Sequence, residues 1–161
     1  MSDKDSRGLD SLLKEAVEAA PLVWVAAGEA HTCSGGTHSR LPDDRRLCWQ
    51  PGLGEGYRVA IDVEPAAAPV PPAHARRLPG VEPAEFWRRW TRAEVRAKLA
   101  AVPILAWIAT RDWSADGPGL PTDPVCALHT ALVGNLVVTW GITLVRPDGP
   151  PAGARMRDWS G

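Results

Sequence analysis

Two histidines and two cysteines lie close together in the first third of the chain. They are His31, Cys33, His38 and Cys48, in the spacing H-x-C-x4-H-x9-C. Imidazole and thiolate are the ligand types that zinc prefers, and four such groups would complete a tetrahedral structural site. The spacing lacks the tight C-x2-C of most zinc loops, and Cys48 falls in a predicted strand. We therefore keep a zinc-supported domain as an alternative to a plain polar loop with a buried Cys48.

Cys126 and His129 are a second pair of reactive side chains. A capping Asp123 and a terminating Gly134 predict a helix that would carry both residues about one turn apart. A thiol in the first turn of a helix has a lowered pKa, so a Cys–His nucleophile pair is one interpretation. Because Cys is among the most commonly buried residue types, we favour an inert, buried Cys126.

The stretch from Arg76 to Lys98 carries seven basic and three acidic residues, interleaved with aromatic rings. Its pattern predicts two helical pieces, 84–90 and 92–101, separated by a capping box at Thr91. Arg and Trp are the residue types that anchor protein interfaces. We predict a partner-binding arginine face made of Trp87, Arg88, Arg89, Trp90 and Arg92. The alternative is that both rings are core and the arginines are its solvated rim.

The 161-residue chain has eight Trp against one Phe and one Tyr, and a net charge of −1. Since a Trp buries roughly 150–250 Å², these rings must supply much of the core. We expect Trp24, Trp107 and Trp140 to be buried, whereas Trp113 and Trp159 fall in a loop and a tail. The near-zero net charge makes nucleic acid an unlikely partner.

Several features bear on the compartment. No apolar run reaches the roughly 18–20 residues of a membrane-spanning helix. Three cysteines are too few for a disulfide scaffold, and the polar start MSDKDSRGLD has no signal segment. We expect a cytoplasmic protein without membrane association. Abundant Ala, Pro, Gly and Arg, with few Ile and Lys, indicate a GC-rich and therefore bacterial genome.

The sequence predicts α+β secondary structure in one domain spanning 1–161. We expect a mixed or antiparallel sheet of about five strands with about four helices packed mainly on one face. The remaining predicted segments are a helix at 9–20, strands at 22–27, 46–50, 57–64, 104–109 and 135–146, a loop at 28–45, an extended proline-rich crossing at 65–83 and a Gly/Pro-rich tail at 147–161. For 104–109 the alternative is more helix. The strands at 46–50 and 57–64 are expected to pair as a hairpin.

No complete catalytic constellation can be assembled, and the chain contains no G-x-S-x-G, H-E-x-x-H or Walker pattern. We therefore favour a non-catalytic interaction or accessory module that docks a protein partner through the arginine face. One alternative is a small-molecule or cofactor-binding enzyme with a pocket lined by Trp24, Trp49 and Trp107. The order of short strands around 51–56 is loosely similar to a flavin-binding split barrel, which would imply a flavin. The sequence makes no prediction of the oligomeric state.

Overall fold

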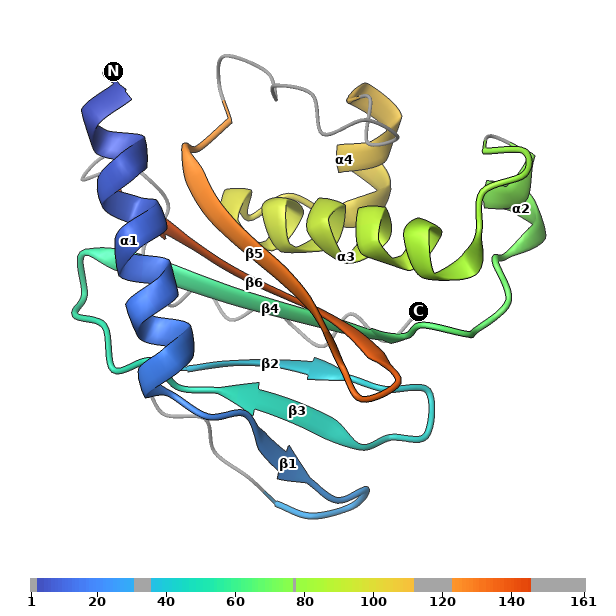
Figure 1. Ribbon diagram of the computed structural model, residues 1–161, viewed down its shortest axis with the longest axis horizontal. Helices are drawn as coiled ribbons and strands as arrows, with labels where there is room; N and C mark the ends of the chain where they lie inside the picture. The colour runs from blue at the N-terminus through green and yellow to red at the C-terminus, as the bar shows by residue number, and fades with distance from the viewer. Residues whose placement is uncertain (1–2, 31–35, 77, 112–122, 146–161) are drawn as a thin grey trace.

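The computed structural model describes residues 3–30, 36–76, 78–111 and 123–145, and it confirms the α+β class (Figure 1). Within these ranges the strands form two three-stranded antiparallel sheets, one strand more than expected in total. The helices are α1 (Asp3–Ala19), α2 (Pro72–Ala75), α3 (Pro83–Ala100) and α4 (Ile104–Thr110). The strands are β1 (Val23–Val25), β2 (Thr37–Arg40), β3 (Arg46–Trp49), β4 (Tyr57–Pro65), β5 (Cys126–Val133) and β6 (Leu136–Leu144).

The larger sheet has the order β4-β6-β5 and the smaller sheet the order β1-β3-β2. A two-residue turn joins β5 to β6, and Gly134 at its first position has a φ of 61°. Such a φ favours glycine, and a Gly-Asn pair between two apolar runs is a hairpin signal. β2 lies beside β4, where the backbone N–H of Val63 donates to Ser39 Oγ at 3.3 Å. This contact joins the two sheets.

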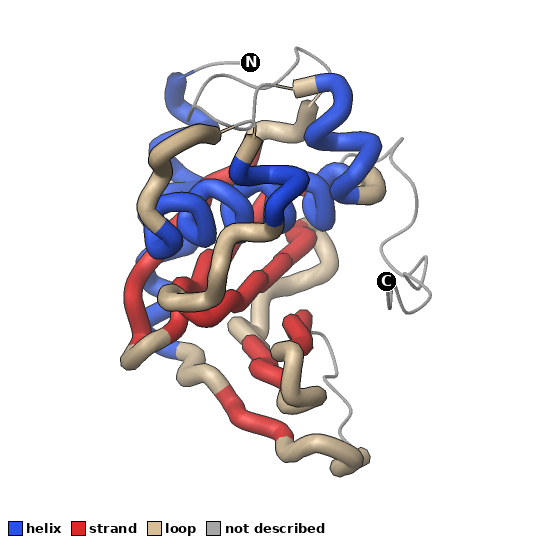
Figure 2. The backbone as a smooth tube through the Cα atoms, turned by 90° about the vertical axis from the view of Figure 1, so that its right-hand side faces the viewer, coloured by secondary structure: helices blue, strands red, loops and turns tan. Residues whose placement is uncertain are grey.

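β6 is the central strand, and its residues Leu136 to Thr143 are buried on both faces. On one face α1 and the smaller sheet close the main core, and on the other lies α3 with α4 packed against it. In Figures 1 and 2 the smaller sheet therefore lies below the larger sheet, with α3 and α4 above it. The main core comprises Leu9, Leu13, Ala16, Leu41, Leu47, Trp49, Ile61, Val63, Ala127, Leu136, Val138, Trp140 and Ile142.

Two predicted elements are wrong in type. The segment 126–133 is strand β5 and not a helix, because its end pairs with β6 through the two-residue turn. The segment 104–110 is helix α4 and not a strand, since it buries Trp107 and Ile108 together while Leu105 is 68% exposed. Both are short apolar runs whose periodicity does not separate a helix from a strand.

The predicted connections also need correction. β3 and β4 do not form a hairpin with each other, because β3 pairs with β1 and β2 while β4 pairs with β6. The expected loop at 28–45 contains β2, and the proline-rich crossing contains the short α2. The two predicted helical pieces are one continuous helix, α3, which begins at Pro83, one residue before the first predicted piece. In the described part of the chain, no helix is long and apolar enough to cross a membrane.

The close approach of α3 to β6 makes a testable prediction. A Cβ at Gly141 would lie 2.4 Å from Val95 Cγ1 and 2.8 Å from Leu128 Cδ2, which is too close for either contact. Gly141→Ala should therefore lower the free energy of unfolding by about 1–3 kcal/mol, measured by urea denaturation. Gly54→Ala, at a position with open space, is the matched control. Equal stability of the two variants would contradict this packing.

Candidate functional site

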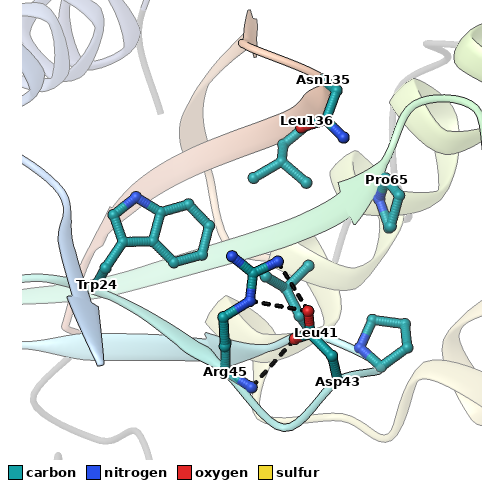
Figure 3. A pocket seen from close by; sticks show the side chains of 8 residues that line it. Trp24, Leu41, Asp43, Arg45, Pro65, Asn135 and Leu136 are labelled. Atoms are coloured by element: carbon teal, nitrogen blue, oxygen red, sulfur yellow. Dashed lines mark hydrogen bonds and ion pairs between the residues drawn. The ribbon is translucent and has the colours of Figure 1, made fainter. Parts of the chain in front are cut away.

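A hollow of about 220 Å³ opens where β1, the β2–β3 turn and the β5–β6 turn meet (Figure 3). We call it the Trp24 hollow. Its lining residues are Trp24, Leu41, Pro42, Asp43, Arg45, Pro65, Asn135 and Leu136. Both sheets contribute to it, so the hollow exists only because the fold brings the two turns together. Polar and apolar atoms contribute about equally to its walls, with one cation and one carboxylate at the rim.

Trp24 forms one wall of the hollow and is 47% exposed, so the expectation of a core position for it is wrong. Neighbouring strand residues point to opposite faces, and in β1 the inward position is taken by Val25, which is 2% exposed. The Arg45 guanidinium carbon lies 5.2 Å from the centroid of the Trp24 ring. A cation–π contact of this kind at an exposed site contributes about 0.5–1 kcal/mol and orients the ring.

A tight turn holds Arg45 in place. Arg45 donates from Nε to Asp43 Oδ2 at 2.8 Å, and its Nη2 lies 2.7 Å from the same oxygen. The hydrogen bond from the Arg45 side chain lowers the pKa of Asp43. The turn closes with the backbone N–H of Leu41 donating to the Arg45 carbonyl at 2.8 Å. Because a guanidinium carries five N–H groups, this ion pair leaves donors for a ligand.

A second group of charged side chains lies between α3 and β4. This α3–β4 cluster consists of Asp62, Glu64, Glu94 and Lys98. Lys98 Nζ lies 2.8 Å from Asp62 Oδ1 and 3.5 Å from Glu94 Oε1, and Ser39 Oγ donates to Asp62 Oδ1 at 2.9 Å. Asp62 is only 3% exposed, so this ion pair is buried. Such a pair fixes how the helix sits on the sheet, because separating the charges would leave one unpaired inside the protein.

Burial sets the protonation of the two glutamates. Desolvation first, and then the neighbouring carboxylates of Asp62 and Glu94, raise the pKa of Glu64 to about 8. Desolvation and Asp62 likewise raise the pKa of Glu94 to about 7, although Lys98 and the Trp90 indole act in the opposite direction. Burial alone would lower the pKa of Lys98, but Asp62 and Glu94 outweigh it and raise that pKa. Within this cluster, Glu64 therefore has the carboxyl group whose proton is held most strongly near neutral pH.

The five residues of the arginine face lie on α3 and divide into two kinds. Trp87 is 8% exposed, and its indole Nε1 donates to the Ala68 carbonyl at 2.7 Å. The Trp90 ring lies 4.9 Å from the His74 ring, beside Phe86. Both rings thus pack inward. Arg88 and Arg89 form ion pairs with Glu85 at 3.8 and 2.7 Å, and Arg92 Nη1 lies 3.4 Å from Thr130 Oγ1.

The structure brings together two of the four predicted zinc ligands. His38 and Cys48 are directly opposite each other in the β2–β3 register, whereas His31 and Cys33 lie outside the described residues. Among the residues that are described, no group of three His, Cys, Asp or Glu side chains is placed to hold a metal ion. Cys48 itself is buried at 1% exposure, as the plain-loop alternative expects.

The other sequence-predicted groups are dispersed. Cys126 and His129 are three residues apart on a strand and so point to opposite faces, which means that the interpretation as a Cys–His pair is wrong. Burial raises the pKa of the Cys126 thiol, consistent with an inert group. Trp49 is fully buried in the main core, and Trp107 lies in a separate cluster beside α3. The structure therefore does not bring Trp49 and Trp107 to the Trp24 hollow.

Two features were missed from the sequence. Asp43 and Arg45 lie in the expected loop at 28–45, which gave no sign that they form the rim of the hollow. Asp62 and Glu64 stand at alternate positions in β4, with the apolar Val63 between them. That alternation predicts a polar face, but nothing local indicates that α3 covers it. Trp113, Trp159 and the predicted tail lie outside the described residues.

Comparison of the chain with models of protein families, with curated proteins and with solved structures finds no match. The function must therefore be inferred from the side chains of the candidate site themselves.

The raised pKa of Glu64 makes stability depend on pH. As pH rises from about 4.5 to 8, the unfolded chain loses this proton before the folded chain does, so the folded state loses stability. A pKa raised from 4.5 to about 8 corresponds to a loss of roughly 5 kcal/mol in the free energy of unfolding across that pH range. We expect Glu64→Gln to remove about 2–4 kcal/mol of this pH-dependent loss. Urea denaturation at pH 5.5 and 8.5 measures it. Glu18→Gln on the exposed side of α1 is the control; a decline in Glu64→Gln as steep as in the control would contradict the burial of this carboxyl.

Proposed function

We propose that this protein is a non-catalytic interaction module that docks a protein partner at the Trp24 hollow. The observation that carries the proposal is the exposure of Trp24, 47% of whose surface faces solvent beside the hollow. Trp and Arg are the residues most enriched among those that dominate binding energy at interfaces. At the Trp24 hollow, one Trp and one Arg contact each other on the protein surface.

The size of the hollow favours a protein side chain as its occupant. Pockets for small molecules and cofactors typically measure about 300–1,000 Å³, whereas the Trp24 hollow measures about 220 Å³. A flavin would need a larger space. One apolar side chain of a partner would fit this volume, packed between Trp24 and Leu136 (Figure 3).

The rim adds a charge preference. The Arg45 guanidinium lies at the rim of the hollow and keeps donors beyond those used for Asp43. A carboxylate of the partner would form charge-assisted hydrogen bonds with these donors. We therefore expect the partner segment to present an apolar side chain with an acidic residue near it.

The arginine face of α3 is a second surface of the same class. Arg88 is exposed, but it shares Glu85 with Arg89, so the local positive charge is partly neutralised. The tryptophans that would anchor a partner there are packed inward. These contacts favour the Trp24 hollow over the arginine face as the docking surface.

Selection from a random peptide display library tests the proposal. The immobilised full chain should enrich peptides that combine an apolar residue with a nearby Asp or Glu. Trp24→Ala should weaken binding of these peptides by at least about tenfold, the loss expected for a central interface Trp. Arg45→Ala should weaken it less, and only for peptides with the acidic residue. Affinities would be measured by calorimetry.

Leu105→Ala is the matched control, because Leu105 is 68% exposed on α4 and lies outside the hollow. It should bind the selected peptides as the unmodified protein does. If no peptide is enriched, or if Trp24→Ala binds them unchanged, the hollow is not a docking surface. If binding is instead lost in a variant with Arg88, Arg89 and Arg92 changed to Ala, the docking surface is the arginine face.

A further inference from the structure

Two arginines of α3 lie over β5, the edge strand of the larger sheet. Arg92 Nη1 lies 3.4 Å from Thr130 Oγ1, and the Arg96 side chain donates a hydrogen bond to the Cys126 sulfur. Alternate side chains of a strand share a face, so Cys126 and Thr130 both face α3. Arg92 and Arg96 are one helical turn apart and half-buried. The fold therefore holds two guanidinium groups together beside this edge.

Positive charge predominates at this place. The β5 sequence CALHTALV contains no Asp or Glu, and Asp123, three residues before β5, is bound by the Arg111 guanidinium. A second copy of β5 would bring like charges together, because Arg92 and Arg96 would meet their own copies. An acidic strand would instead bring opposite charges together, which stabilises a strand pair.

The backbone of β5 is open on the side away from β6. Val133 and Leu136 flank the two-residue turn as a hydrogen-bonded pair, and the orientation of the backbone groups alternates from there along the ladder. The N–H and C=O groups of Leu128, Thr130 and Leu132 therefore point outward. Within the described part of the chain, no backbone hydrogen bond reaches these groups. The edge thus offers donors and acceptors to a further strand.

We infer that the β5 edge and the two arginines together bind an acidic, extended segment of another protein, which adds to the larger sheet as an antiparallel strand. The neighbouring strands of this sheet are antiparallel as well. A segment residue opposite Thr130 would exchange both backbone hydrogen bonds with it and place its side chain on the same face, toward α3. Acidic residues at alternate positions of the segment would then form charge-assisted hydrogen bonds with Arg92 and Arg96.

The strand edge favours a polypeptide over a nucleic acid as the ligand. A phosphate backbone would satisfy the arginines, but it has no alternating N–H and C=O groups to pair with β5. Leu132, which is 62% exposed near the end of β5, adds an apolar contact that a peptide side chain would cover. This inference does not depend on the Trp24 hollow, since Trp24 lies on β1 of the smaller sheet.

Calorimetry and amide exchange of the full chain with a synthetic peptide test the inference. The probe has eight residues, as β5 has, with Glu and Thr at alternate positions. At saturation the amides of Leu128, Thr130 and Leu132 should exchange at least about tenfold more slowly than without peptide. The amides of His129 and Ala131, which already face β6, should change little. This alternation distinguishes strand addition from attraction by charge alone.

Two N-methylated forms of the probe separate backbone pairing from charge. Methylation of the Glu nitrogens blocks the groups that face β5 and should abolish binding, whereas methylation of the Thr nitrogens should leave it unchanged. The double variant Arg92→Gln/Arg96→Gln should weaken binding at least about tenfold, because it removes charged hydrogen-bond donors. Arg40→Gln, which removes an exposed charge of β2, and Trp24→Ala are the matched controls and should bind the probe as the unmodified protein does.

A probe that does not bind, or outward amides that gain no protection from it, would overturn the inference. Equal binding of the two methylated probes would also overturn it, since charge alone would then explain the attraction. If a single-stranded oligonucleotide displaces the probe and binds more tightly, the arginines serve phosphate recognition instead. Loss of probe binding in Trp24→Ala, with the double arginine variant unaffected, would place the peptide at the Trp24 hollow and not at β5.

Discussion

Burial of both faces of β6 is the constraint on which the remaining structure depends. A strand that is covered on both sides needs two layers, and the chain supplies α1 with the smaller sheet on one side and α3 on the other. The α3 side also carries polar groups, which must find partners inside. Thr139 Oγ1 lies 2.8 Å from Thr91 Oγ1, and Lys98 lies 2.8 Å from Asp62. Because Gly141 has no side chain, α3 can approach β6 closely enough for these contacts.

The sequence predicts well those elements whose own pattern determines them. The helix at 9–20 and the strands at 57–64 and 135–146 all form, because each shows a clear period or a long apolar run. The sequence does not predict elements whose type depends on the strand with which they pair. The segment 126–133 is rich in Ala and Leu and is apolar on both faces, which suits a helix locally; pairing with β6 makes it a strand. Strand pairing itself was mispredicted because neighbours along the chain are not neighbours in these sheets.

The candidate site was likewise predictable only in part from the sequence. Composition indicates that tryptophan rings supply much of the core. Which of these rings are buried and which are exposed depends on the fold. Trp49 and Trp87 are buried, whereas Trp24 stays outside because Val25 takes the inward position of β1. The Trp24 hollow then arises from two turns far apart in the sequence, those at Asp43 and Asn135. No local spacing could reveal their meeting.

Chemical-shift mapping tests the central claim, docking at the Trp24 hollow, most directly. The ¹⁵N-labelled chain would be titrated with a display-selected peptide while the indole N–H of Trp24 and the backbone amides are followed. Docking at the hollow predicts the largest shifts at the Trp24 indole and at the amides of Arg45 and Asn135, the residues that line it. Largest shifts along α3 at Arg88 and Arg89, with an unmoved Trp24 signal, would contradict it.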